Sequence, residues 1–231
     1  MYPEFISHPH ISSYPAMLLV GFFFGYVMAR WRASKMRFEG RRIDNLALIL
    51  LVMGPLGGRF FSRLFYLPDA TFWSALKVWD GGGLVFYGGF LFGVGSAVIY
   101  CLVQRLSIFE VVDIFSPSVA LGLAFGRIGC FMAGCCFGDL CLEPAKLSLL
   151  SDPAKRRQVQ TIPMLSRSSF PLRVRFPVRS EAYEQHTELG LLPPQSIRSL
   201  PVHPTQLYEA AAAFALCLWL NLRFKNRKFP G

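Results

Sequence analysis

The stretch Val119-Ala-Leu-Gly-Leu-Ala-Phe-Gly-Arg-Ile-Gly-Cys-Phe-Met-Ala133 decides the fold class of this chain. A helix needs about 20 mostly apolar residues to cross the hydrocarbon core of a bilayer. Five segments approach that length, and they are residues 14–29, 45–65, 83–102, 111–133 and 206–222. Hydrophobic residues make up 53% of the 231 residues and charged residues 16%, which is too apolar for an ordinary soluble domain. The sequence therefore predicts an all-α polytopic membrane protein with about five transmembrane helices.

Arg127 is a charged residue inside this apolar stretch. A guanidinium near the centre of a membrane helix costs about 2.5–3.5 kcal/mol unless it reaches the interface, pairs with a carboxylate or meets a ligand's negative charge. Gly122, Gly126, Gly129 and Gly134 flank it and leave room for a bulky group near the backbone. We interpret Arg127 as the anchor for a phospholipid phosphate. The alternative is a structural arginine that snorkels or is ion-paired.

The net charge of +10 raises the question of a nucleic-acid partner, but its placement indicates a membrane orientation instead. Basic residues follow the first span, the third span and the fifth span; they are Arg30, Arg32, Lys35, Arg37, Arg41, Arg42, Arg105, Arg223, Lys225, Arg227 and Lys228. Short loops rich in Lys and Arg stay in the cytoplasm. We therefore expect the N-terminus outside and the C-terminus in the cytoplasm. The basic clusters are interpreted as orientation signals and contacts with membrane lipids, with no nucleic-acid partner.

The chain is predicted to have three parts in order. Residues 1–138 hold the first four membrane helices, residues 139–204 form a small external head region, and residues 205–231 hold the fifth helix and a basic cytoplasmic tail. Prolines dispersed among charged residues break the apolar pattern in the head region. Strand character is expected at residues 172–178.

Four cysteines lie between residues 130 and 141, and they are Cys130, Cys135, Cys136 and Cys141. Their spacing matches no common zinc pattern, so no metal is predicted. If this end of the fourth span faces an oxidising compartment, a structural disulfide between Cys135 and Cys141 or between Cys136 and Cys141 is expected. Otherwise the four are expected to be buried thiols.

The fifth span begins with Pro201-Val-His-Pro-Thr-Gln-Leu-Tyr-Glu-Ala210. Thr205 is a natural N-cap for this helix. Gln206 and Glu209 are one turn apart, so together with His203 they can point into one interfacial space. A histidine and a carboxylate at this place can be interpreted in two ways. They can be a general base with its orienting group, or a helix cap with its supporting residues.

Together these motifs resemble the prolipoprotein diacylglyceryl transferase family over almost the whole chain. The matching segments are Tyr14-Pro-Ala-Met-Leu-Leu-Val-Gly-Phe22, Gly57-Gly-Arg59, Leu64-Phe-Tyr66, Trp79-Asp-Gly-Gly82, Phe86-Tyr-Gly-Gly89, Asp113, Pro117, Gly126-Arg-Ile-Gly129, Phe131, Gly134, Gly138 and His203-Pro-Thr-Gln-Leu-Tyr-Glu209. Any one of them is weak, whereas their order and spacing are specific.

The resemblance implies a cofactor-free enzyme of the bacterial cell inner membrane. Such an enzyme moves the diacylglyceryl group of phosphatidylglycerol to the lipobox cysteine of a prolipoprotein signal peptide and releases glycerol 1-phosphate. The acceptor thiol, with a pKa of about 8.5, must lose its proton, and the leaving phosphate needs a fixed positive charge. The residues that the resemblance assigns to substrate binding are Arg127, Tyr14, Arg59, Gln206 and Tyr208. The candidate catalytic residues are His203, Tyr87 and Glu209.

The chain departs from the family pattern at several positions. Cys130, Ala133 and Cys135 stand where the family has Asn, Asn and Glu, and Tyr87 stands where many members have a histidine proposed to activate the thiol. A tyrosine with a pKa near 10 is a poor base, so His203 becomes the candidate base while Tyr87 positions the lipid. Family members have seven spans, and the present sequence matches the first five. The sixth span of the family carries a second essential arginine, and nothing in this sequence matches it. The alternatives are a non-catalytic lipid- or lipoprotein-binding relative and a transferase with another acceptor.

Overall fold

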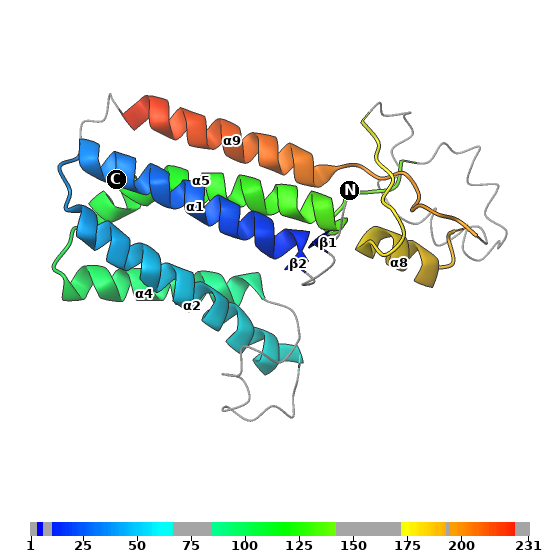
Figure 1. Ribbon diagram of the computed structural model, residues 1–231, viewed down its shortest axis with the longest axis horizontal. Helices are drawn as coiled ribbons and strands as arrows, with labels where there is room; N and C mark the ends of the chain where they lie inside the picture. The colour runs from blue at the N-terminus through cyan, green and yellow to red at the C-terminus, as the bar shows by residue number, and fades with distance from the viewer. Residues whose placement is uncertain (1–3, 7–10, 67–84, 142–171, 193–194, 225–231) are drawn as a thin grey trace. The chain divides into compact units, whose positions relative to one another are not determined.

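The computed structural model describes residues 4–6, 11–66, 85–141, 172–192 and 195–224. Within these ranges, the long helices are α1 (Ser13–Lys35), α2 (Gly40–Tyr66), α4 (Phe86–Val103), α5 (Ile108–Ala133) and α9 (Thr205–Phe224) (Figure 1). A shorter helix, α8 (Glu181–Glu188), precedes α9. Strands β1 (Glu4–Ile6) and β2 (Ile11–Ser12) form a small antiparallel pair ahead of α1.

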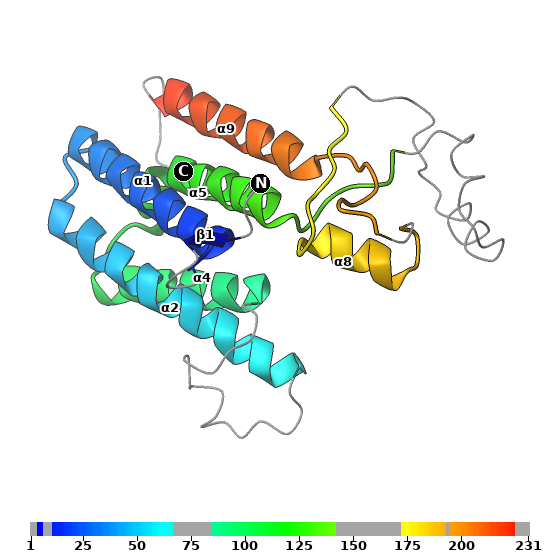
Figure 2. The same ribbon diagram turned by 45° about the vertical axis from the view of Figure 1, so that its right-hand side comes forward.

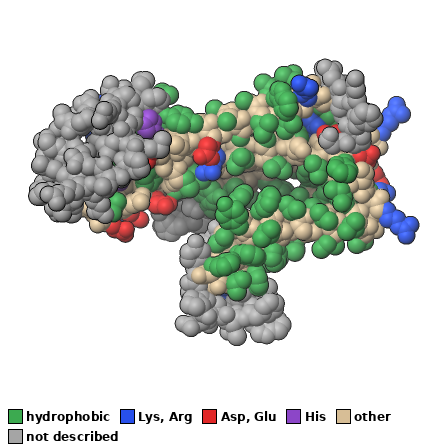
Figure 3. All heavy atoms as spheres, turned by 180° about the vertical axis from the view of Figure 1, so that it is seen from behind, with side chains coloured by type: hydrophobic (Ala, Val, Ile, Leu, Met, Phe, Trp, Pro, Cys, Tyr) green, Lys and Arg blue, Asp and Glu red, His purple; other side chains and the backbone are tan. Residues whose placement is uncertain are grey.

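The five long helices confirm the predicted spans. Each contains an 18-residue window with a mean hydropathy of at least 1.2 and at most two charged residues. Their lengths of 18 to 27 residues correspond to about 27–40 Å at 1.5 Å per residue, which is enough for a hydrocarbon core of about 30 Å. Figure 3 shows hydrophobic side chains spread over the surface of the helices. The chain is an all-α multi-pass membrane protein.

The contacts of the chain divide it into two compact units, which are described separately. The first unit comprises residues 1–23 and 120–219, and the second comprises residues 24–119 and 220–231. Helices α1, α5 and α9 each contribute to both units. The predicted division into residues 1–138, 139–204 and 205–231 follows position along the chain, and it stays a prediction.

In the second unit, Arg32 is a buried structural residue. Its side chain is 2% exposed, and its Nη2 donates to the backbone oxygen of Asp113 at 2.8 Å. The guanidinium lies over the ring of Phe224 at 3.9 Å, and Nη1 donates to Asn221 at 3.2 Å. The sequence led us to interpret the basic residues after the first span as orientation signals and lipid contacts. For Arg32, the interpretation as a lipid contact is wrong. Arg32 instead joins α1 to α5 and to the end of α9.

Helices α2 and α4 pack closely in the second unit because glycines line their contact. A Cβ on Gly89 would lie 2.9 Å from the backbone oxygen of Gly54, and Val85 donates a hydrogen bond to the oxygen of Gly58 at 3.0 Å. Helix α2 continues through Pro55 to its end at Tyr66.

The first unit contains the beginning of α1, the second half of α5 and most of α9, which lie side by side (Figures 1 and 2). A Cβ on Gly21 would lie 2.8 Å from the Cβ of Phe125, so α1 and α5 are in close contact there. The rings of Phe125 and Phe214 meet edge to face with centroids 5.8 Å apart, which joins α5 to α9. These contacts fix the helix ends that carry the candidate site.

The head region has its own small core in the first unit. Its buried members are Leu140, Phe176, Ala182, Leu191 and Val202. The expected strand at residues 172–178 appears only as isolated bridges, from Val174 to Val202 and from Pro177 to Arg198. Proline has no N–H for a ladder, which explains why the bridges do not extend into a sheet.

His186 is buried in this head region. It is 3% exposed, and its Nδ1 accepts a hydrogen bond from the backbone N–H of Leu200 at 3.3 Å. Burial lowers the pKa of His186 from 6.5 to about 4, because the charged form loses its hydration. The neutral imidazole is therefore a structural acceptor.

Candidate functional site

Helix α5 ends in a turn whose backbone N–H groups donate hydrogen bonds back to the last turn of the helix. Gly134 has φ of 76°, and the N–H groups of Gly134 and Cys135 both donate to the oxygen of Cys130, at 2.9 and 3.1 Å. This left-handed conformation is typical of a helix C-terminus and favours glycine. A Cβ on Gly134 would also lie 2.7 Å from the Cβ of Ser180, so a larger residue does not fit.

Two side chains in the first turn of α9 donate hydrogen bonds to the backbone of this turn. Gln206 is fully buried, and its Nε2 donates to the oxygen of Cys135 at 2.6 Å. Thr205, expected as the N-cap, is the first residue of α9, and its hydroxyl donates to the oxygen of Cys136 at 3.1 Å. The end of α5 and the start of α9 are therefore locked together.

Arg127 forms an ion pair with Glu209, with Nε 2.6 Å from Oε2. The side chains are 30% and 47% exposed, so the pair lies at the surface of its unit. Only Nε is engaged: the two terminal nitrogens of Arg127 make no hydrogen bond or ion pair with any residue in the described ranges. A guanidinium in this state can still present a two-pronged donor to an anion.

Tyr14 lies beside this arginine. It is half-buried near the beginning of α1, within electrostatic range of Arg127 and of the cysteines that follow it. A Cβ on Gly129 would be 3.4 Å from the Cα of Tyr14 and 3.1 Å from the Cβ of Met17. The absence of a side chain at Gly129 therefore allows α1 to bring Tyr14 close to the last turns of α5.

His203 has its backbone fixed in the turn before α9. Its oxygen accepts from the N–H groups of Gly138 and Thr205 at 2.9 Å each, and its N–H donates to Asp139 at 3.0 Å. Its Nδ1 lies 3.4 Å from the hydroxyl of Tyr208. Glu209, which the sequence suggested as its orienting group, has Arg127 as its ion-pair partner. A role for Glu209 in orienting His203 stays a prediction.

The structure gathers most of the predicted site in the first unit. That set comprises Tyr14, Arg127, His203, Gln206, Tyr208 and Glu209. Arg59 and Tyr87 belong to the second unit, where Arg59 is 4% exposed on α2 and Tyr87 is 73% exposed on α4. Their roles as substrate-binding and catalytic residues stay predictions.

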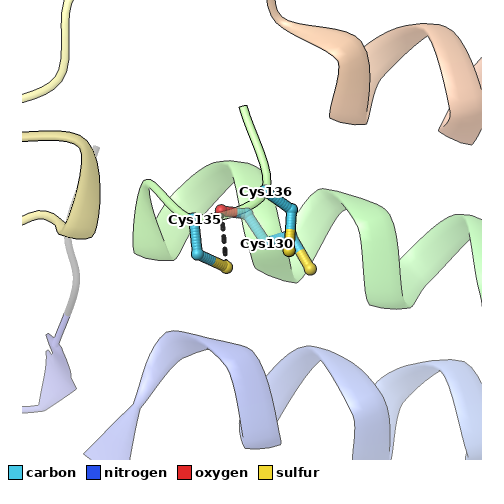
Figure 4. A group of neighbouring side chains, drawn as sticks. All are labelled: Cys130, Cys135 and Cys136. Atoms are coloured by element: carbon cyan, nitrogen blue, oxygen red, sulfur yellow. Dashed lines mark hydrogen bonds between the residues drawn. The ribbon is translucent and has the colours of Figure 1, made fainter. Parts of the chain in front are cut away.

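Three thiols come together at the end of α5, and the sequence did not predict their grouping (Figure 4). The sulfur atoms of Cys130, Cys135 and Cys136 all lie within 4.8 Å of one another. All six cysteines are free, so the expected disulfide between Cys141 and either Cys135 or Cys136 is wrong. The reason is the backbone: φ of 76° at Gly134 and 55° at Cys136 turns the two thiols back toward Cys130.

These thiols differ in exposure and ionisation. Cys130 and Cys141 are buried, whereas Cys135 is half-buried and Cys136 is exposed, so the expectation of buried thiols fails for the last two. A hydrogen bond with Cys130 and burial raise the pKa of Cys135, and burial raises the pKa of Cys136. Both thiols are therefore protonated and weakly nucleophilic at neutral pH.

Five apolar helices and a half-exposed arginine at the end of one of them define a multi-pass membrane protein with a candidate anion-binding site. Comparison with known proteins gives the family. The sequence profile of the prolipoprotein diacylglyceryl transferases matches residues 3–231, and the chain belongs to that family.

Individual relatives agree with this assignment. The phosphatidylglycerol–prolipoprotein diacylglyceryl transferase of Burkholderia ambifaria is 30% identical over 93% of this chain and 69% of its own length. The protein of the same name in Clostridium tetani is 32% identical over 60% of this chain and 54% of its own length. That in Rhodopirellula baltica is 33% identical over 57% of this chain and 28% of its own length. The chain thus spans about half or less of the last two relatives.

Proposed function

We propose that this protein transfers the diacylglyceryl group of phosphatidylglycerol to the lipobox cysteine of a prolipoprotein signal peptide, releasing glycerol 1-phosphate. The observation that carries the proposal is the state of Arg127. Its Nε is held by Glu209, while its two terminal nitrogens have no partner in the described part of the chain. A phosphate diester offers two oxygens to such a fork, and the forked pair of charge-assisted hydrogen bonds fixes its orientation.

In this reaction, Arg127 stabilises the leaving group. The acceptor sulfur attacks the glyceryl carbon, a C–S bond forms, and the C–O bond to phosphate breaks with both electrons staying on oxygen. Negative charge grows on that phosphate oxygen, and a guanidinium at a site of low dielectric stabilises it more strongly than water does. Tyr14, Gln206 and Tyr208, from α1 and α9, are proposed to bind the same lipid, and Arg59 and Tyr87 are also proposed to contact lipid.

His203 is proposed as the base that takes the thiol proton. Its three backbone hydrogen bonds hold the turn, and any residue other than proline can make them. They therefore give no reason for an imidazole at this position. Imidazoles as a class accept protons near neutral pH, whereas phenols do so only at high pH.

We also propose that the protein resides in the bacterial inner membrane with its N-terminus and head region outside and its C-terminus in the cytoplasm. The support is the excess of basic residues in the short loops on one side. Alkaline phosphatase fused near residue 171 should be active, and the same enzyme fused after residue 231 should be inactive. The reverse pattern would contradict both the orientation and the location of the site.

The transfer is tested with purified protein in phosphatidylglycerol bilayers and a peptide that carries a lipobox cysteine. We expect a peptide mass increase equal to one diacylglyceryl group, with no product from a serine peptide or from phosphatidylcholine bilayers. Arg127→Ala should lower the rate of product formation by about 100-fold or more. Arg42→Ala is the matched control, because Arg42 makes a similar Nε ion pair at 2.7 Å with Glu39.

A second function is favoured by the cysteines at the family's Asn and Glu positions. Cys130 and Cys135 lack the polar contacts that an Asn amide and a Glu carboxylate would make at these two positions. A relative that binds lipid or lipoprotein without reacting would bind phosphatidylglycerol in the same bilayers through Arg127 and give no product with the cysteine peptide. A transferase with another acceptor would consume phosphatidylglycerol without modifying this peptide.

A further inference from the structure

The end of α5 carries a cluster of three thiols that the proposed chemistry does not use. Cys130, Cys135 and Cys136 have all their sulfur atoms within 4.8 Å of one another. Within the described ranges, no fourth histidine, cysteine or acidic side chain belongs to the group. We propose that these three thiols bind one thiophilic divalent cation of the Zn²⁺ class and leave its remaining position open to the acceptor thiol. The second half of this inference rests on the proposed function.

The spacing of the sulfur atoms is close to that of a zinc site. Three sulfurs at zinc–sulfur distances of about 2.3 Å in tetrahedral geometry are about 3.8 Å apart. The cluster therefore has to contract by at most about 1 Å to reach that geometry. Cys136 is exposed, so its side chain can rotate without displacing packed neighbours.

The backbone that carries the thiols is already held in place. The carbonyl oxygens of Cys135 and Cys136 accept hydrogen bonds from Gln206 and Thr205, and the N–H of Cys135 donates to Cys130. Cys136 has φ of 55°, a conformation that residues with a side chain adopt at a cost. A preorganised site of this kind binds a metal ion without first ordering its ligands.

The gradient of exposure suggests how the ion enters and where its open side lies. Cys130 is buried, Cys135 is half-buried and Cys136 is exposed. An ion held by three protein ligands keeps a free position, which is the arrangement of catalytic rather than structural zinc sites. Cys130 follows Arg127 by three residues on α5, so the two side chains lie about one helical turn apart and the cluster is near the candidate phosphate anchor.

A bound ion gives this arrangement a chemical purpose. A thiol that coordinates such an ion loses its proton to solvent or to a nearby base, because the metal stabilises the thiolate. The acceptor of the proposed reaction is itself a thiol that must react as thiolate. The open position would then hold the acceptor sulfur deprotonated near Arg127.

Metal binding is tested on the full-length protein in detergent under reducing conditions. We expect about one zinc per chain by elemental analysis, and Co²⁺ substitution should give the sulfur charge-transfer and visible bands of a tetrahedral thiolate site. Cys130→Ser and Cys136→Ser should lose both signals. Cys141→Ser and Cys217→Ser are the matched controls, since both cysteines are buried outside the cluster, and they should keep them.

Several outcomes would overturn the metal site. The site is rejected if the wild-type protein shows no thiolate band at saturating Co²⁺, or if the cluster variants and the control variants contain equal amounts of metal. It is also rejected if a disulfide within the cluster survives reduction. Thermal melts of each serine variant show whether it is folded. A folded Cys136→Ser protein that keeps the Co²⁺ spectrum also rejects the proposal.

The open position is tested without turnover. In the absence of phosphatidylglycerol, the cysteine peptide should change the Co²⁺ spectrum and its serine analogue should not. Arg127→Ala should keep the metal and this spectral change while losing transfer. Metal binding in wild-type protein without any transfer would reject the proposed function alone, whereas transfer by metal-free wild-type protein would reject the inference alone.

Discussion

Replacing Arg127 by lysine separates a forked phosphate site from a simple positive charge. In the structure, Glu209 occupies Nε, and the remaining two nitrogens have no partner in the described ranges. A lysine at this position keeps the charge and has one nitrogen for both Glu209 and the phosphate. We expect the lysine variant to resemble Arg127→Ala more than wild type.

The magnitude follows from the number of hydrogen bonds lost. Each hydrogen bond to a charged group contributes about 1.5–3 kcal/mol, so two of them contribute about 3–6 kcal/mol in the transition state. At 1.36 kcal/mol per factor of ten, Arg127→Ala should lower kcat/KM by about 10²- to 10⁴-fold. Arg127→Lys should lower it by roughly 10²-fold, since one of the two bonds is lost and the other is shared with Glu209.

The measurement is the initial rate of peptide lipidation in phosphatidylglycerol bilayers, with lipid dilution to obtain KM. Arg42→Lys provides the control, because its exposed pair with Glu39 has a similar geometry and no proposed contact with lipid. It should stay within about twofold of wild type, since exposed ion pairs contribute about 1 kcal/mol or less. If Arg127→Lys keeps more than a third of wild-type kcat/KM while folded, the forked phosphate site is wrong.

Three further predictions address the turn, the base and the head region. Gly134→Ala should destabilise the fold by about 2 kcal/mol or more, because position 134 has φ of 76° and the new Cβ would lie 2.7 Å from the Cβ of Ser180. The control is Gly122→Ala, whose Cβ would meet no atom within 4 Å. It should leave the unfolding temperature unchanged or raise it. His203→Gln should lower the rate about 100-fold or more, and a rate within a few-fold of wild type would eliminate His203 as the base. The pKa of His186 is about 4 in the folded protein and 6.5 in the unfolded chain, so the unfolded chain binds more protons between these pH values. The free energy of unfolding should therefore fall by at most about 3 kcal/mol as the pH falls from 6.5 to 4. His186→Asn should flatten this dependence in thermal melts at different pH values, and an unchanged slope would contradict the prediction.

The sequence predicted the spans well because hydropathy over about 20 residues is a local property. It did not predict that Arg127 pairs with Glu209, because rules for neighbouring side chains reach only three or four residues along a helix. Nor did it distinguish the buried Arg32 from the surface arginines beside it, since only contacts with Asp113 and Phe224 do so.

The cysteines show a further limit of sequence reasoning. Spacing along the chain suggested pairing with Cys141, and the structure instead groups Cys135 and Cys136 with Cys130. The deciding feature is a left-handed backbone at Cys136, a residue type with no special preference for it. Glycine at position 134 was the visible signal that the helix ends there, and it gave no information on where the next two side chains would point.

The two interpretations of Arg127 drawn from the sequence, an ion-paired structural residue and a phosphate anchor, are compatible in this geometry. An arginine at the end of a membrane span needs a negative partner when no ligand is bound, because an unpaired charge is costly in low dielectric. Glu209 supplies that partner through Nε at 2.6 Å. The phosphate of a lipid does not have to displace this carboxylate, since the fork of terminal nitrogens points away from the bond that Glu209 makes. The ion pair therefore compensates the charge of Arg127 and orients the guanidinium for the anion it is proposed to bind.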